Sequence, residues 1–162
     1  SLNNIIVVDS NNNRIQVISN SFKFIAKWGQ IGNKKGQFIN PEGIAVDRFD
    51  NIYIADSGNN RIQKFDNRGN FIMQWGKKGS NPGEFNYPTS ISINSKDEIF
   101  ILDKNNRRIQ KFYNNGIYIT EWGNDENHSI FESPSGIAVN EEDDVLVTDE
   151  SSDLIKVFTD II

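Results

Sequence analysis

The sequence contains no cysteine, one histidine and four prolines among its 162 residues. The absence of cysteine excludes disulfides, thiol catalysis and cysteine-ligated zinc sites. The single histidine, His128, cannot form a multi-histidine metal site within one chain. No apolar run approaches the roughly 18 residues that a membrane-spanning helix needs, so we expect no membrane span.

Excess positive charge is also missing, because the formal net charge is −5. A protein that binds a polyanion such as a nucleic acid needs a concentrated basic face. The net negative charge therefore makes polyanion binding a less favoured function. The hydrophobic content of 36% and the charged content of 24% are typical of a soluble globular protein.

One ten-residue segment occurs four times, as DSNNNRIQVI, DSGNNRIQKF, DKNNRRIQKF and DESSDLIKVF. Each copy begins with an aspartate, at Asp9, Asp56, Asp103 and Asp149, so the spacings are 47, 47 and 46 residues. A fixed period in the forties indicates a repeat architecture.

Residues 41–88 give the clearest single repeat. Alternating apolar residues predict strands at 43–47, 52–56, 61–65 and 71–75, separated by the turn sequences RFDN, SGNN and DNRGN. Four short strands in each repeat form an antiparallel meander, which is typical of a propeller blade.

The repeat, written P-x-G-I-A-V-D…N-I-Y-I-A-D-S-x-N-x-R-I-Q-x-F…G-x-F…W-G, resembles the NHL repeat over nearly the whole chain. The resemblance implies an all-β fold, a β-propeller of four-stranded antiparallel blades, most often six in number. Four blades are expected in one partial propeller domain, approximately at residues 1–29, 41–76, 88–123 and 134–162.

The expected strands number fourteen, which is about three and a half blades. A closed six-bladed ring at this period needs about 280 residues. We therefore expect an incomplete ring: a part of a longer six-bladed protein, copies that complete a ring together, or an open fragment. Open blade edges also make self-association possible.

Residues that recur in every blade are expected to be structural. The aspartates can accept backbone N–H bonds in the following turn, where Asn12, Asn59 and Asn106 suit left-handed backbone. The arginines can form forked bonds to a carboxylate. The tryptophans are expected between blades, with stacking on bases or sugars as the alternative. This structural ladder comprises Asp9, Arg14, Asp56, Arg61, Asp103, Arg108, Asp149, Trp28, Trp75 and Trp122.

Departures from the repeat are the candidates for function. Because antiparallel strands alternate in direction, the Asp-to-Arg turns and the loops after each Trp-Gly share one face. The first two loops carry four lysines and the third, residues 123–134, is acidic. The candidate partner-binding residues are Lys34, Lys35, Lys77, Lys78, Asp125, Glu126 and His128. The third loop alone could instead hold a cation or be simply solvated.

These observations favour a non-enzymatic binding or scaffold module that presents its loop face to a protein partner. An RNA-binding NHL propeller is the first alternative. Part of a metal-dependent lyase or lactonase-like propeller enzyme is the second. We identify no catalytic, cofactor-binding or metal-binding residue in the sequence, and expect no cofactor.

Overall fold

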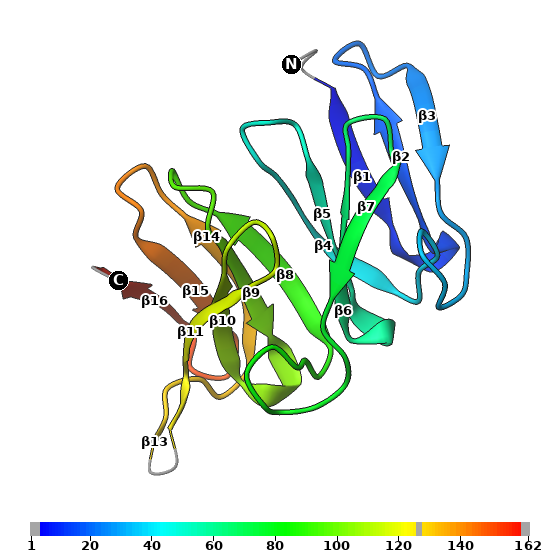
Figure 1. The fold of residues 1–162 in the computed structure, drawn as a ribbon. Helices are drawn as coiled ribbons and strands as arrows, with labels where there is room; N and C mark the ends of the chain where they lie inside the picture. Colours follow the sequence, from blue (N-terminus) through cyan, green and yellow to red (C-terminus); the bar gives the residue numbers. More distant parts are fainter. Residues whose placement is uncertain (1–3, 126–127, 160–162) are drawn as a thin grey trace.

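The chain folds into a row of antiparallel sheets in the computed structural model, which describes residues 4–125 and 128–159 (Figure 1). We number these sheets as blades 1 to 4. Blade 1 contains β1 (Ile5–Asp9), β2 (Arg14–Ile18) and β3 (Phe24–Trp28). Blade 2 contains β4 (Pro41–Val46), β5 (Ile52–Asp56), β6 (Arg61–Phe65) and β7 (Phe71–Trp75). Blade 3 contains β8 (Pro88–Ile93), β9 (Ile99–Asp103), β10 (Arg108–Phe112) and β11 (Tyr118–Trp122). Blade 4 contains β14 (Pro134–Val139), β15 (Val145–Asp149) and β16 (Leu154–Phe158).

The expected fold class, an incomplete all-β propeller, is confirmed. Blades 2 and 3 have four strands, and blades 1 and 4 have three each. Within residues 4–125 and 128–159, blade 1 has no innermost strand and blade 4 has no outermost strand, unlike the complete blades. Figure 1 shows the blades side by side in chain order, in an arc with an open end at each terminus.

Two details differ from the sequence-based expectation. The inner strand of blade 2 begins at Pro41, two residues earlier than expected. The inner strands of blades 3 and 4 also begin at prolines, Pro88 and Pro134, and a register shift follows each proline. A proline is tolerated as the first strand residue because the missing N–H is not needed in the ladder there. A short hairpin of β12 (Asn124–Asp125) and β13 (His128–Ser129) also lies within the third loop, where no strand was expected.

The hydrophobic core lies between blades rather than in one centre. Between blades 2 and 3, Tyr53, Ala55 and Ile62 pack against Ile99 and Ile101, and all five are fully buried. Equivalent clusters fill the spaces between blades 1 and 2 and between blades 3 and 4. Each blade therefore buries both of its faces only where it has two neighbours.

The Asp-to-Arg turns contain short 3₁₀ helices, η1 (Ser10–Asn12), η2 (Ser57–Asn59) and η3 (Lys104–Asn106). The expectation of left-handed backbone at Asn12, Asn59 and Asn106 is wrong by one residue. The left-handed residues are those that follow the helices, Asn13, Asn60 and Arg107, because they close the helical turn. Within the described residues, no helix is long and apolar enough to cross a membrane.

Candidate functional site

The candidate site is the face of the arc that carries the Asp-to-Arg turns and the loops between blades, which we call the loop face. It lies along the lower side of the molecule in Figure 1. The loops cover residues 29–40, 76–87 and 123–133, and each joins the outer strand of one blade to the inner strand of the next. The shape of this face depends on what holds these loops.

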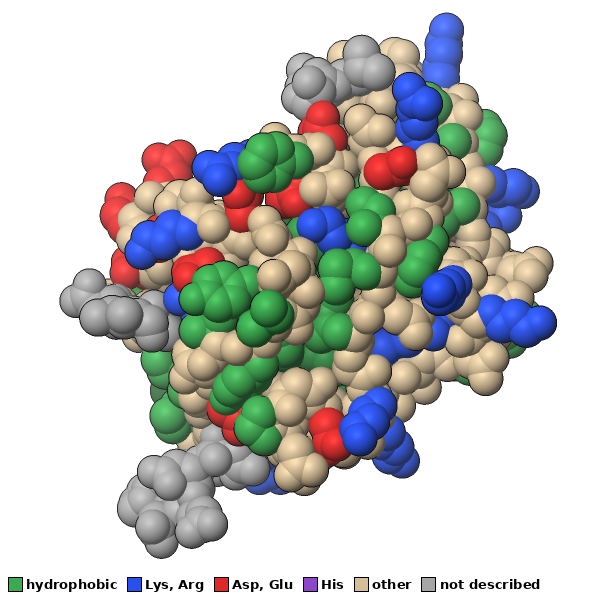
Figure 2. Space-filling model, in the orientation of Figure 1, with side chains coloured by type: hydrophobic (Ala, Val, Ile, Leu, Met, Phe, Trp, Pro, Cys, Tyr) green, Lys and Arg blue, Asp and Glu red, His purple; other side chains and the backbone are tan. Residues whose placement is uncertain are grey.

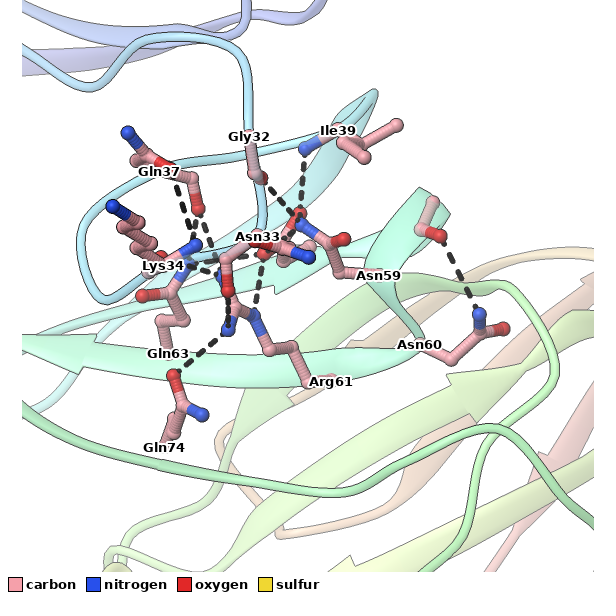
Figure 3. Close-up of polar contacts among 12 residues, drawn as sticks. Gly32, Asn33, Lys34, Gln37, Ile39, Asn59, Asn60, Arg61, Gln63 and Gln74 are labelled. Atoms are coloured by element: carbon pink, nitrogen blue, oxygen red, sulfur yellow. Dashed lines mark hydrogen bonds and ion pairs between the residues drawn. The ribbon is translucent and has the colours of Figure 1, made fainter.

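Arg61 anchors the first loop to blade 2, as Figure 3 shows. Its Nε donates to Asp56 Oδ2 at 2.7 Å. Its terminal nitrogens donate to the backbone carbonyls of Asn33, Lys34 and Gln37 at 2.8, 2.9 and 3.0 Å. One buried guanidinium therefore binds three carbonyls of a loop that precedes it by about half a repeat.

The neighbours of Arg61 bind the same loop. Asp56 Oδ1 accepts the backbone N–H of Ile39 at 2.8 Å, and the amide of Asn59 donates to Asp56 and to the carbonyl of Gly32. Gln63 donates to the Gln37 carbonyl at 2.8 Å. The expectation that the aspartate accepts backbone N–H groups of the following turn is therefore wrong, because the backbone N–H that Asp56 accepts belongs to the preceding loop. We call this group of Asp, Asn, Arg and Gln side chains the loop clamp.

Blade 3 repeats the loop clamp with one added charge. Arg108 Nε donates to Asp103 Oδ2 at 2.9 Å, and its terminal nitrogens donate to carbonyls of the second loop. Arg108 also forms an ion pair with Glu121 at 3.0 Å, where blade 2 has Gln74. Burial raises the pKa of Asp103, although hydrogen bonds from Asn86, Asn106 and Arg108 oppose the rise.

The two end blades depart from this pattern. In blade 1, Arg14 contacts Asp9 at 2.7 Å, and its side chain is 31% exposed. Hydrogen bonds from Asn12 and Arg14 lower the pKa of Asp9. No described loop lies in front of Arg14 for its terminal nitrogens to bind.

In blade 4, Leu154 replaces the arginine and Lys156 takes its role. The Lys156 ammonium contacts Asp149 Oδ2 at 2.8 Å and donates to the backbone carbonyl of Ile130. Burial works to raise the pKa of Asp149, but the bonds from Lys156 and from the N–H groups of Glu132 and Ser133 outweigh it and lower that pKa to about 2. Sequence reasoning missed Lys156; the signal was a lysine where Gln63 and Gln110 stand in the complete blades.

The tryptophans of the ladder lie between blades. The indole of Trp75 in blade 2 is 5.9 Å from the Phe112 ring in blade 3, and Trp28 and Trp122 make equivalent contacts with Phe65 and Phe158. Such aromatic pairs contribute about 0.5–1.5 kcal/mol beyond their buried area. The rings are therefore engaged by protein rather than presented as a stacking platform.

The four lysines of the first two loops are exposed. Lys77 forms an ion pair with Glu84 at 3.2 Å, and Lys35 lies over the Phe71 ring at 5.4 Å. The backbone of Lys34 is held by Arg61, so its side chain projects from an anchored segment. Asp125 and His128 belong to the β12–β13 hairpin, but their side chains, and Glu126 altogether, lie outside the described residues.

Two further basic residues belong to this face, Lys104 in η3 and the exposed Arg107 after it. Sequence reasoning missed them, although DKNNRR in the third repeat departs visibly from DSGNNR in the second. Acidic side chains gather toward blade 4, where Glu132, Glu150 and Asp153 are exposed. The loop face is therefore basic over blades 1 to 3 and acidic at blade 4.

The same polarity runs through the sequence. Residues 1–40 contain five basic and one acidic side chain, whereas residues 134–162 contain one basic and eight acidic side chains. In Figure 2, acidic side chains gather at the upper left, over the blade 4 end, and basic ones predominate on the right, over blade 1.

Comparison with solved structures identifies propellers. The chain is similar to a streptogramin B lyase, with a TM-score of 0.73 and 17% identity, covering 97% of this chain and 48% of that one. It is similar to a catalytically inactive virginiamycin B lyase from Staphylococcus aureus with quinupristin, with a TM-score of 0.71 and 18% identity, covering 100% and 54%. It is also similar to the WD40 β-propeller domain of Doa1, with a TM-score of 0.74 and 15% identity, covering 98% and 47%. The chain thus spans about half the length of these structures, and identities this low show the fold alone.

No curated protein matches the sequence. A family described as 6-bladed beta-propeller matches residues 49–158, which are 110 of the 162 residues. This range contains the loop clamps of blades 2 and 3 and all three strands of blade 4. The expectation of a β-propeller is confirmed, and the chain belongs to the 6-bladed β-propeller family.

Proposed function

We propose that this chain is a non-enzymatic interaction module of the NHL-repeat type whose loop face binds a protein partner. The observation that carries the proposal is the loop face itself, where anchored loops present separated positive and negative charge. The similarity in fold to a WD40 domain is compatible with such a role but supplies no partner.

The anchoring supports binding because a rigid surface loses little conformational entropy when a partner docks. In blade 2, six backbone carbonyl or N–H groups of the first loop bind the clamp. The lysine side chains of that loop therefore start from fixed backbone positions.

The charge separation supports a protein partner in particular. A nucleic acid presents one sign of charge along its whole length, whereas Glu132, Glu150 and Asp153 would repel it at blade 4. A protein with acidic groups opposite Lys34, Lys35, Lys77 and Lys78 and basic groups opposite blade 4 would fit both ends. Such complementarity mainly sets specificity and association rate.

Selection of a random peptide library against the purified chain tests this proposal. We expect selected peptides to lose at least tenfold in affinity when Lys34, Lys35, Lys77 and Lys78 are all changed to glutamate. The matched control changes Glu141 and Glu142 to lysine, because these exposed residues lie on the opposite face in the turn before β15. Equal loss in both variants, or none in either, would contradict a binding role of the loop face.

RNA binding is the second candidate, because Lys104 and Arg107 add two basic groups to the four lysines of the loop face. A labelled 20-nucleotide single strand distinguishes it from the protein-binding proposal. Binding that weakens steeply with salt and is lost in the four-lysine variant would favour RNA. Absence of binding at low salt would remove this candidate.

An enzymatic role is the third candidate, because two of the similar structures are lyases. Within residues 4–125 and 128–159, no three His, Cys, Asp or Glu side chains gather as a metal site. Metal analysis of the purified chain tests the role directly, and a stoichiometric divalent ion would favour an enzyme over a binding module.

A further inference from the structure

The face of the arc opposite the loop face, which we call the hairpin face, carries exposed apolar side chains on blades 2 and 3. It is formed by the turns between the first and second and between the third and fourth strands of a complete blade, along the upper side of Figure 1. Phe49, Tyr113 and Ile117 lie in these turns and are 63%, 51% and 58% exposed. Both blades have a neighbour on each side, so an open blade does not cause this exposure.

The same three positions are polar in the other blades. The counterparts of Phe49 are Lys96 and Glu142, those of Tyr113 are Ser19 and Asp66, and those of Ile117 are Lys23 and Asn70. The apolar residues are therefore departures from the repeat rather than part of it. Single exposed apolar residues are normal on a protein surface, whereas a group of them points to an interaction site.

A buried lysine holds the turns that carry these side chains against one another. The Lys64 ammonium, in blade 2, donates to the backbone carbonyl of Asn114 at 3.1 Å and lies 3.9 Å from Asp47 Oδ2. It thereby links turn 113–117 of blade 3 to turn 47–51 of blade 2. Burial lowers the pKa of Lys64, although nearby carboxylates oppose the fall. A buried ammonium is unfavourable unless it is paired, so this link depends on both turns staying in place.

The turn that carries Phe49 is fixed by two further contacts. Asp47 Oδ1 accepts the backbone N–H of Phe49 at 2.9 Å. Arg48 lies over the Phe49 ring at 5.0 Å and forms an ion pair with the buried Asp97 of blade 3 at 2.7 Å. The exposed ring therefore has a defined position beside the inner turn of blade 3. A surface that is ordered before docking loses little conformational entropy when a partner binds.

The hairpin face is acidic where the loop face is basic. Eight acidic but only two basic side chains belong to four neighbouring turns, at residues 47–51, 94–98, 113–117 and 140–144. The last of these turns is tied to blade 3, because the backbone N–H and the hydroxyl of Ser95 donate to Asp143 at 2.9 and 2.7 Å. Glu141 and Glu142 in the same turn are exposed. Figure 2 shows the acidic side chains gathered at the upper left.

We propose that Phe49, Tyr113 and Ile117 form a second docking surface, which binds a segment of another protein with apolar side chains among lysines and arginines. Aromatic side chains are enriched in the cores of protein interfaces, and the acidic turns would attract the basic groups of such a segment. An acidic segment would be repelled here and would fit the lysines of the loop face instead. The two faces therefore favour partners of opposite charge.

Peptide selection with the loop face neutralised tests the proposal. The probe is a phage library of random dodecapeptides, and the target is the full chain with four alanine substitutions, at Lys34, Lys35, Lys77 and Lys78. Because the target lacks these loop-face charges, acidic peptides that bind the loop face should not be selected. We expect the selected peptides to carry net positive charge together with Phe, Leu or Trp. Fluorescence anisotropy of labelled synthetic copies gives their dissociation constants.

Substitutions taken from the repeat itself locate the binding. A triple variant with Phe49→Glu, Tyr113→Asp and Ile117→Asn carries at each position a residue that another blade has there, so it should fold, as circular dichroism can verify. This variant is more acidic than the wild type, so a loss of affinity for basic peptides reports the lost apolar contacts. We expect a loss of at least tenfold.

Two further variants separate charge from general effects. Glu141→Lys with Glu142→Lys should weaken binding at least threefold, mainly through slower association. The matched control is Ile25→Asn with Ile72→Asn, at exposed positions of two outer strands, and should leave the affinity unchanged.

Four outcomes would overturn the proposal. The first two are selection of no peptides or of acidic peptides only, and equal loss of affinity in the triple variant and the outer-strand control. Binding to phosphatidylcholine vesicles that the triple variant abolishes would favour a membrane surface instead. Self-association that the triple variant abolishes would favour a second copy of the chain. None of these outcomes bears on the function proposed for the loop face, because the target lacks the lysines on which that function depends.

Discussion

The four ladder aspartates occupy the same repeat position but should contribute differently to the free energy of unfolding. Asp56 and Asp103 are fully buried and bind both an arginine and a loop, Asp9 is partly exposed and lacks a loop, and Asp149 faces a lysine. A buried ion pair depends on every partner being present, because a charge left alone in the interior is strongly unfavourable. Removing the basic partner of each aspartate should therefore lower the free energy of unfolding by an amount that differs from blade to blade.

Replacement of Arg61 by alanine should lower the free energy of unfolding by about 3–5 kcal/mol, because Asp56 would be left buried without its charge partner. Replacement of Arg14 by alanine should cost about 1 kcal/mol or less, because that pair is partly exposed. Urea unfolding of both variants measures the difference. Equal costs would contradict the assignment of the loop clamp as a buried unit.

Asp149 should contribute stability that depends on pH. Its pKa is about 2 in the folded chain and roughly 3.9 for an ordinary aspartate, so its contribution is full above about pH 4 and is lost as the pH falls toward 2. Asp149→Asn should be less stable than the wild type at pH 7, with a shallower loss of stability between about pH 4 and 2. Denaturant unfolding across this range is the measurement, with the exposed Glu142→Gln as control. Identical pH profiles for wild type and Asp149→Asn would be inconsistent with the lysine-bound carboxylate.

Among the elements, the loops show most clearly how local backbone and packing combine. Gly76 follows β7 with φ of +93°, and a Cβ there would lie 2.5 Å from Phe85 Cδ2. Gly83, in the same loop, has φ of +79° with no atom within 4 Å of such a Cβ. Both positions require left-handed backbone, but only Gly76 is also enclosed.

Gly83→Ala should therefore cost about 1–3 kcal/mol from backbone strain alone. Gly76→Ala should cost about 1–3 kcal/mol more, because the buried Phe85 ring has to move. Thermal unfolding of the two variants measures this difference. A Gly83 variant as unstable as the Gly76 variant would show that the enclosure by Phe85 contributes nothing.

The strands were predictable from sequence because their signals are local. The second strand of blade 2 begins and ends as expected, at 52–56, and the repeat places its counterparts at 5–9, 99–103 and 145–149, since apolar residues end at an aspartate each time. The loop residues that the clamp binds were not predictable. Arg61 binds backbone carbonyls 24 to 28 residues away, and every residue has such a carbonyl whatever its side chain. The contact of Lys156 with the backbone carbonyl of Ile130 was not predictable for the same reason, whereas its ion pair with Asp149 was signalled by the lysine itself.

At the scale of the whole molecule, stability should fall from the middle of the arc toward its ends. Blades 2 and 3 have covered faces on both sides, whereas blades 1 and 4 have one covered face each. In repeat proteins the stability of a unit depends on its nearest neighbours. The open blades are therefore the part of the chain with least support.

Hydrogen exchange should follow this order, with amides of β9 and β10 exchanging last and those of β1 and β16 first. Mass spectrometry of the intact chain at several exchange times measures it. Uniform protection of all four blades would contradict a stability that depends on neighbours.

The loop clamp joins residues that are synthesised in a fixed order, with the loop first and the clamp after it. Arg61 and Gln63 bind residues 33–37, which leave the ribosome before them, so this contact needs no chain that is still to be translated. Each blade can thus fasten the loop behind it as synthesis proceeds. A nascent chain stalled once Phe65 is outside the ribosome should resist proteolysis at residues 33–37, whereas one stalled before Arg61 emerges should be cut there.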